Sequence, residues 1–204
     1  MKIACVSDLH GYLPEIPPAD LLLIAGDICP LDIQRNHESC VNWLNNEFAE
    51  WIKKTAIPTF VIAGNHDFVF QQKINTTFNY LQDSAAEFSG LNIWGTPWQP
   101  VFFNWAFNAT EEQLKEKWDL IPANTDILVV HGPPYMAGDL TINHIRTGSS
   151  SLRERIEAIQ PKLVVCGHIH EGRGVYKIKD TIVINASMVD ERYQIHFDVP
   201  VIEI

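Results

Sequence analysis

The sequence predicts an α/β protein in which two mixed β-sheets pack as a sandwich flanked by helices. Short apolar runs typical of buried strands alternate with amphipathic helical patterns, which indicates parallel βαβ units. Toward the end of the chain the helical patterns give way to short strands and tight turns, which indicates antiparallel pairing. With 204 residues and 46% hydrophobic composition, the chain is long enough for one sizeable core, so we expect a single domain over residues 1–204.

The first elements predict a strand, helix, strand unit. Residues 2–7 and 20–25 are nearly continuous apolar runs, the pattern of strands covered on both faces. Between residues 36 and 54 the apolar side chains recur at helical spacing, and Pro58 ends that pattern. Residues 59–63 resume a buried strand, so we expect a right-handed crossover.

The middle of the chain is more irregular. Residues 88–94 predict short strands on either side of a turn, and Thr110 to Gln113 form a capping box that opens a helix ending near Ile121. A strand is expected at 126–130, a helix from about Ser151, and a further buried strand at 162–166.

The last part of the chain predicts antiparallel strands. Residues 175–178 and 181–184 flank a two-residue connection and predict a hairpin. Residues 193–199 and 201–204 are expected to add further strands.

Charge and cysteine content limit the function classes. The formal net charge of −10 argues against binding to polymeric nucleic acid, which needs clustered Lys and Arg. No stretch approaches the roughly 18 apolar residues of a membrane span, and the first residues do not resemble a signal peptide. The four cysteines are scattered without metal or redox spacing, so we expect reduced thiols and a cytoplasmic protein.

Five of the eight histidines lie in short motifs that each follow a predicted strand. The motifs are Asp8-Leu9-His10, Asn65-His66-Asp67, His131-Gly132-Pro133-Pro134 and Gly167-His168-Ile169-His170, and Gly26-Asp27 follows a fifth strand. Imidazole and carboxylate are ligands of divalent metals, and sheet-based enzymes place their sites at the carboxyl ends of strands. Each motif alone is common, but so many polar groups at the ends of buried strands would be costly to desolvate without a shared purpose. Together they predict a metal site.

The order of these motifs resembles the calcineurin-like metallophosphoesterase superfamily. Four stretches look like its metallophosphoesterase-domain-containing subfamily (UPF0046, fetal-brain 239-like), namely residues 93–100, 130–134, 167–172 and 185–187. The resemblance implies the calcineurin-like metallophosphoesterase fold and a dinuclear metal centre. It also implies phosphodiesterase activity on small substrates such as 2′,3′-cyclic nucleotides and aryl phosphodiesters.

The resemblance also implies a ligand set. Carried over by position, it assigns one metal to Asp8, His10 and His170, the other to Asn65, His131 and His168, and a bridging role to Asp27. Mixed nitrogen and oxygen ligands suit several divalent ions. Mn or Fe is preferred by resemblance, and Zn, Co and Ni also fit. The expected nucleophile is a hydroxide that bridges the two ions.

One motif imidazole, His66, has no metal assigned to it. We expect His66 to protonate the leaving alkoxide as general acid. Asp67 is expected to orient His66, or else to be a carboxylate that the dipole of a following helix stabilises.

Candidate substrate-binding residues come from two loops. Trp98 belongs to an aromatic segment that could stack a nucleobase, although aromatic residues in such a segment also serve packing. Arg146 and His144 follow His131 and could reach a phosphate, or could lie on the surface.

Other functions on the same residues remain open. A phosphomonoesterase would use the same centre, and a scaffold of this fold would bind proteins, although scaffold members tend to lose ligands and none is lost here. A Ser/Thr protein phosphatase is disfavoured because Gly26-Asp27 lacks the Asp-Arg-Gly continuation of such enzymes. The expected partner is a small phosphate ester.

Overall fold

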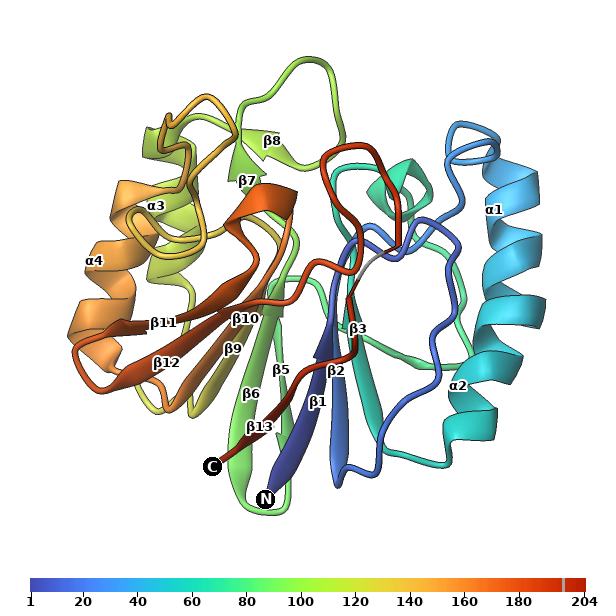
Figure 1. The fold of residues 1–204 in the computed structure, drawn as a ribbon, viewed down its shortest axis with the longest axis horizontal. Coiled ribbons are helices and arrows are strands. Elements are labelled where there is room, and N and C mark those ends of the chain that lie inside the picture. The colour runs from blue at the N-terminus through green and yellow to red at the C-terminus, as the bar shows by residue number, and fades with distance from the viewer. Residues whose placement is uncertain (196) are drawn as a thin grey trace.

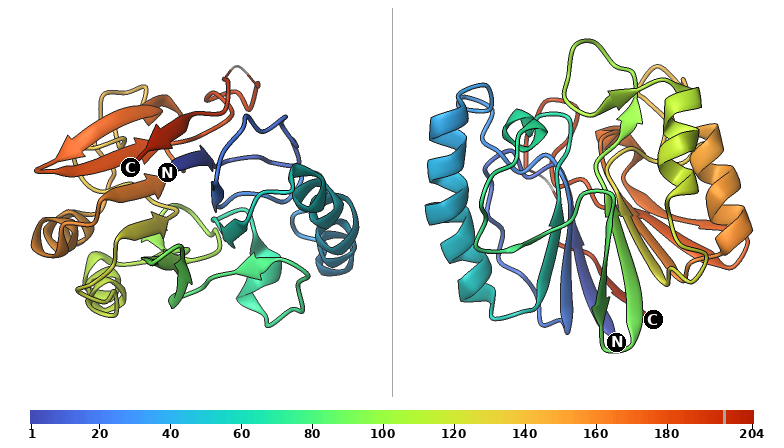
Figure 2. Two further views of the ribbon diagram at one scale, coloured as in Figure 1. Left: turned by 90° about the horizontal axis from the view of Figure 1, so that it is seen from below. Right: turned by 180° about the vertical axis from the view of Figure 1, so that it is seen from behind.

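The computed structural model describes residues 1–195 and 197–204. Two large sheets pack against each other, and helices cover the outer side of each (Figures 1 and 2). The predicted fold class, two mixed sheets in a sandwich flanked by helices, is confirmed. No helix among the described residues is long and apolar enough to cross a membrane.

The first sheet has the strand order β13-β1-β2-β3-β4. Its strands are β1 (Lys2–Val6), β2 (Leu21–Ala25), β3 (Thr59–Ile62), β4 (Asn79–Tyr80) and β13 (Val201–Glu203). β1, β2, β3 and β4 run parallel, and β13 pairs antiparallel with β1. The expected helix at 36–54 is a helical stretch on the outer face of this sheet, made of α1 (His37–Trp43), the π-helical turn η1 (Leu44–Phe48) and α2 (Ala49–Thr55).

The second sheet has the order β11-β12-β10-β9-β6-β5. Its strands are β5 (Ser84–Phe88), β6 (Leu91–Thr96), β9 (Ile127–Val130), β10 (Leu163–Cys166), β11 (Gly174–Ile178) and β12 (Thr181–Asn185). Its outer face carries α3 (Glu111–Asp119), which begins with the predicted capping box, and α4 (Ser150–Ile159). The short pair β7 (Gln99–Pro100) and β8 (Asn108–Ala109) lies beside it.

Alternation along the strands explains the continuous apolar runs. In β1, Ile3 and Cys5 pack against the second sheet, whereas Ala4 and Val6 face the helical side. All four side chains are completely buried. Because both faces of the sheet are covered, the strand has no polar face, which is the pattern that the sequence shows.

The parallel strands bring the predicted motifs to one edge. β1, β2, β3, β9 and β10 all end toward the upper edge of the sandwich in Figure 1. The segments that follow these strands therefore meet across the junction of the two sheets.

The prediction of a strand at 193–199 is wrong. Among the described residues of that range none belongs to a strand, and residue 196 lies outside the description. Asp190 accepts backbone hydrogen bonds from Arg192 and Gln194, which folds this segment into a turn instead. The strand expected at 201–204 is present as β13.

Candidate metal centre

The loops that follow five strands carry the predicted ligands, and four of these residues have an unusual backbone. Asp8, His10, Asp27 and His168 have φ of 55°, 44°, 54° and 67°. Non-glycine residues in this left-handed region cost on the order of 1–3 kcal/mol each and gather at functional sites. The surrounding sheets therefore hold the ligands in conformations that a free loop would avoid.

The first cluster consists of Asp8, His10 and His170, whose ligand atoms all lie within 4.8 Å of one another. The Asp8 carboxylate accepts hydrogen bonds from the Ser187 hydroxyl at 2.7 Å and from the backbone N–H of His168 at 3.1 Å. His170 Nδ1 donates to the carbonyl of Asp190 at 2.9 Å. Its Nε2 therefore faces Asp8 Oδ1, 3.4 Å away.

The second cluster is built around His131, with Asp8 and Asp27 within 4.8 Å. His131 Nδ1 donates to the carbonyl of Ala25 at 2.8 Å, which leaves the lone pair of Nε2 pointing inward. This Nε2 lies 2.9 Å from Asn65 Oδ1. Burial lowers the pKa of His131, so two acceptors face each other, an arrangement that a cation between them would satisfy.

Asp27 lies between the two clusters. Its Oδ2 is 3.5 Å from His131 Nε2 and 3.9 Å from His10 Nε2. Burial raises the pKa of Asp27, and the charges of Asp67 and Asp8 raise it further. Several buried carboxylates in one place need positive charge to stay ionised, which divalent ions would supply.

The imidazole of His10 provides the sharpest test of whether a metal fits. Its side chain is 3% exposed, and both of its ring nitrogens lack a hydrogen-bond partner. Burial lowers the pKa of His10 to about 3, so the ring is neutral and its lone pair is available. A buried imidazole without partners is costly, and an ion bound to it would remove that cost.

Two glycines leave room for the carboxylates. A Cβ at Gly64 would overlap Asp27 Oδ1, and a Cβ at Gly167 would overlap Asp8 Oδ2. Both glycines belong to the sequence motifs, and their missing side chains let these segments approach the ligands. The residues present therefore fit divalent metal ions.

His66 lies beside the ligands, 6% exposed, with Nε2 4.0 Å from Asp27 Oδ2. Its Nδ1 is 2.5 Å from Gln34 Oε1, and the Trp105 ring lies against it at a tilt of 33°, with centroids 4.2 Å apart. Burial lowers the pKa of His66 to about 4. The imidazole is therefore neutral near pH 7 in the free protein and carries its proton on the nitrogen that faces Gln34.

The two roles expected for Asp67 stay predictions, and in the structure its carboxylate serves mainly backbone N–H groups. Its carboxylate accepts the backbone N–H groups of Ile28, Cys29 and Gly64 at 2.8–3.1 Å. Asp67 is the N-cap residue of the short helix η2 (Phe68–Gln71), but its carboxylate makes no hydrogen bond to that helix. The side-chain hydrogen-bond partner of His66 is Gln34. Asp67 ties the segment that carries Asp27 to the turn that carries Asn65.

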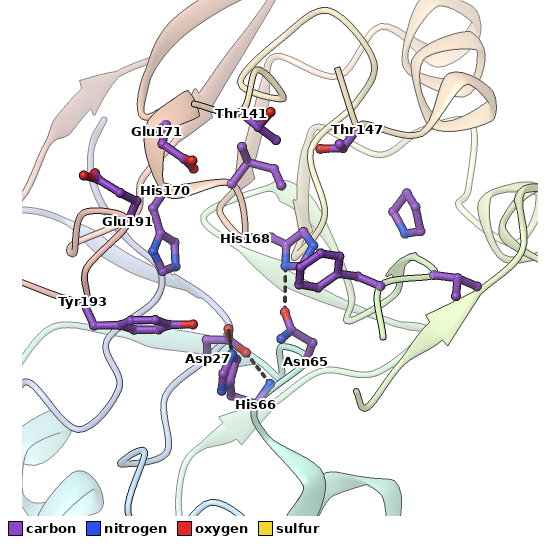
Figure 3. Close-up of a pocket in the computed structure, with 14 residues that line it drawn as sticks. Asp27, Asn65, His66, Thr141, Thr147, His168, His170, Glu171, Glu191 and Tyr193 are labelled. Atoms are coloured by element: carbon purple, nitrogen blue, oxygen red, sulfur yellow. Dashed lines mark hydrogen bonds and ion pairs between the residues drawn. The ribbon is translucent and has the colours of Figure 1, made fainter. Parts of the chain in front are cut away.

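A cavity of about 310 Å³ opens above the ligands (Figure 3). Its lining consists of Asp27, Asn65, His66, Pro100, Val101, Phe102, Thr141, Thr147, His168, Ile169, His170, Glu171, Glu191 and Tyr193. Among these described residues there is no Lys or Arg. Apart from protonated histidines, positive charge at this cavity would therefore come from bound metal.

The three expected substrate-binding residues do not line this cavity in the part of the chain that the structure describes. Trp98 Nε1 donates to Asp83, and Lys117 lies over its ring at 4.2 Å. Arg146 pairs with the buried Asp139 at 2.7 Å, and His144 is exposed. Trp98 and Arg146 are held by these partners in the structure, and substrate binding by them or by His144 stays a prediction.

Sequence reasoning missed several residues at the cavity. Phe102 was one of six aromatic residues in its segment, and nothing in the pattern separated it from Trp98. Glu171 directly follows a motif, which was an available signal. Glu191 gave no signal, and Tyr193 gave none because it begins the segment 193–199, which predicted a strand.

Comparison with known proteins addresses the family of the chain. The family model described as calcineurin-like phosphoesterase matches residues 1–172. Metallophosphoesterase domain-containing protein 1 of Homo sapiens is 34% identical, and the match covers 95% of this chain and 68% of that protein. A UPF0046 protein of Caenorhabditis elegans is 32% identical over 98% of this chain and 60% of its own length.

Solved structures agree on the fold. A crystal structure of a protein of Thermus thermophilus aligns with a TM-score of 0.60 and 16% identity, covering 90% of this chain and 88% of that one. The resemblance seen in the order of the motifs is confirmed by the matched family model and by these relatives. The chain therefore belongs to the calcineurin-like phosphoesterase family.

Proposed function

We propose that this protein is a phosphodiesterase that cleaves small, nucleotide-like phosphodiesters with the help of two divalent metal ions. The observation that carries the proposal is the convergence of seven donor side chains, one of which is His10, whose buried ring nitrogens have no hydrogen-bond partner. Asp8, His10 and His170 would hold one ion. Asn65, His131 and His168 would hold the other, and Asp27 would contact both.

When bound, two ions supply Lewis acidity that activates water and neutralises the phosphoryl oxygens. The proposed ions are Mn or Fe, and Zn, Co or Ni would also suit the mixed nitrogen and oxygen ligands. The chain itself fixes the ligand orientation, because backbone carbonyls accept the outer N–H of both His131 and His170.

His66 is the proposed general acid for the leaving alkoxide. It is the one motif imidazole outside the ligand set, and it lines the cavity next to Asp27. Because its pKa is low in the free protein, His66 would gain its proton when the phosphoryl anion binds nearby and favours the imidazolium form. A stationary Gln34 contact would keep Nε2 directed at the cavity.

A diester is favoured over a monoester by charge. A diester carries one negative charge and a monoester carries two near neutral pH, whereas the cavity offers no Lys or Arg among its described lining residues. The substrate is also proposed to be a small molecule, in keeping with the size of the cavity.

The cytoplasmic location expected from four reduced cysteines stays a prediction. All four cysteines are free and buried in the structure.

The test combines metal analysis with two substrates. The purified protein, loaded with Mn, should contain two ions per chain and should cleave bis(p-nitrophenyl) phosphate with a higher kcat/KM than p-nitrophenyl phosphate. Asp27→Asn should lose metal and both activities, because the proposed bridge has lost one charged oxygen. A reversed ratio would favour the monoesterase, and one tightly bound ion at full activity would exclude the dinuclear centre.

A further inference from the structure

The two sides of the cavity differ in chemistry. Glu171 and Glu191 form one side, beside His170, and we call this pair the acidic wall (Figure 3). Pro100, Val101 and Phe102 form the apolar wall. The Phe102 ring lies next to His168, with centroids 6.1 Å apart, so the two walls flank opposite ligand histidines.

The acidic wall is held in place by its neighbours. Glu171 Oε1 accepts the backbone N–H of Ile142 at 3.0 Å. Glu191 follows Asp190, whose carbonyl accepts the proton of His170 Nδ1. Both glutamates therefore belong to segments anchored at the candidate metal centre, and both residues line the same cavity as its ligands.

The charge of this wall is only weakly compensated. Arg192 Nε lies 3.7 Å from Glu191 Oε1, but the Arg192 side chain is 82% exposed, so water screens the pair. Glu171 has no ion pair among the described residues. A substrate that lies against this wall therefore meets two negative charges.

A phosphodiester has two ester arms, and the cavity offers a separate wall for each. The apolar wall suits an uncharged aromatic or aliphatic arm. Two carboxylates repel an anionic arm and attract a cationic one. The negative phosphoryl group between the arms would stay with the metal ligands.

We propose that the acidic wall selects diesters whose second arm carries a positive charge, such as an amino-alcohol, and discriminates against arms that carry a further phosphate. This inference rests on the proposed function, because the phosphoryl group must lie at the metal centre for one arm to reach Glu171 and Glu191. The order of preference is a cationic arm first, then a neutral arm, then an anionic arm.

The experiment uses two p-nitrophenyl diesters that differ in one atom. One is p-nitrophenyl phosphorylcholine, and the other is its carbon isostere, in which a tert-butyl group replaces the trimethylammonium group. The leaving group and the size of the retained arm are the same, so the ratio of the two kcat/KM values reports the charge of the arm alone.

The Mn-loaded wild type should prefer the choline ester by about threefold to tenfold at low ionic strength. In the double variant Glu171→Gln, Glu191→Gln the ratio should fall to about one. Glutamine at position 171 keeps an oxygen that can accept the Ile142 N–H. Glu116→Gln, on the exposed side of α3, is the control and should leave the ratio unchanged.

A wild-type ratio of one or less, or a ratio that survives in the double variant, would overturn the selection by the acidic wall. If both esters are hydrolysed and one of these two results is found, only the inference fails and the proposed function stands. If neither ester is cleaved, the proposed function fails, and the two esters then serve as calorimetric ligands. Their dissociation constants should show the same preference in wild type and lose it in the double variant, and equal constants would overturn the inference.

Discussion

Asp67 shows how one side chain can build a site from outside it. Its two oxygens collect three backbone N–H groups from two segments, those that carry Asp27 and Asn65. Burial raises the pKa of Asp67, although these hydrogen bonds act in the opposite direction. The carboxylate therefore sets the spacing between two proposed ligands without being one.

Replacing Asp67 should weaken metal retention more than it slows proton transfer to the leaving group. Asp67→Asn puts an amide N–H₂ where backbone donors converge, so we expect a loss of about 1–3 kcal/mol in unfolding free energy and weaker metal retention. Urea unfolding and metal analysis measure both. An Asp67→Asn protein with wild-type metal content and stability, but with slow cleavage of poor leaving groups, would instead assign Asp67 to proton transfer.

The variant His66→Ala should behave in the opposite way. It should keep its metals and lose on the order of 10²–10⁴-fold in kcat for alkyl leaving groups, because no proton donor remains. The loss should shrink for p-nitrophenyl esters, whose leaving phenolate departs without a proton. The comparison variant is His168→Ala, which should lose metal and activity for every leaving group. Equal losses for good and poor leaving groups in His66→Ala would mean that His66 orients the phosphate.

The meeting of the candidate ligands could be predicted because each belongs to a segment that follows a buried strand, where the sequence pattern is strongest. His10 and Asp27 come together in space because parallel strands end at a common edge. The substrate residues could not be predicted in this way. The direction of Trp98 depends on Asp83, 15 positions earlier in the chain, and no local pattern reports such a partner.

At the level of elements, Glu111 links two helices. It is the first residue of α3, and its Oε1 accepts hydrogen bonds from the backbone N–H and hydroxyl of Ser151, both at 2.7 Å. The same oxygen accepts from Ser149, the N-cap of α4, at 2.9 Å. The N-termini of α3 and α4 are thus held together by one carboxylate.

This link should depend on pH. Burial raises the pKa of Glu111, but the hydrogen bonds from Ser151, Ser149 and Ser150 outweigh burial and hold its pKa below the ordinary value of 4.5. Its stabilisation is therefore complete above about pH 4.5 and is lost as the pH falls through the lowered pKa.

We expect Glu111→Gln to lower the unfolding free energy by about 1–3 kcal/mol at pH 7 and by much less near pH 3. Urea unfolding at both pH values checks this, with Glu116→Gln on the same helix as control. A deficit that is equal at both pH values would show that packing, and not the ionised carboxylate, provides the link.

Elements with a strong internal pattern were predicted well. The capping box of α3 and the hairpin of β11 and β12 are defined by residues close together in sequence, and both are present. The segment at 193–199 was not, because Asp190 closes a turn there that the apolar and polar pattern does not encode. The capping box has a specific sequence pattern and could be recognised, whereas the alternation of apolar and polar residues at 193–199 did not reveal the turn at Asp190.

At the level of the whole molecule, the candidate metal centre joins the two sheets. Asp8 follows β1 in the first sheet and accepts the N–H of His168, which follows β10 in the second. The proposed ligands come from both sheets in the same way. A bound metal would therefore stabilise the packing of one sheet on the other.

Metal should raise the thermal stability. An ion present at about one hundred times its Kd adds about 2.7 kcal/mol, which for a chain of this length corresponds to a rise in Tm of about 5–10 °C. Calorimetric scans with Mn and with a chelator measure the difference. The variant Asp27→Asn should show little or no shift. A wild-type Tm that is the same with Mn and with chelator would argue against a centre shared by the sheets.

The distribution of the ligands from Asp8 to His170 also has a kinetic consequence. Parallel strands far apart in sequence must pair before these side chains meet, and such long-range pairing comes late in folding. An ion would then have nothing to bind in the transition state. Metal should slow the unfolding of the chain while leaving its folding rate unchanged, so that a loaded molecule persists long after free metal has gone.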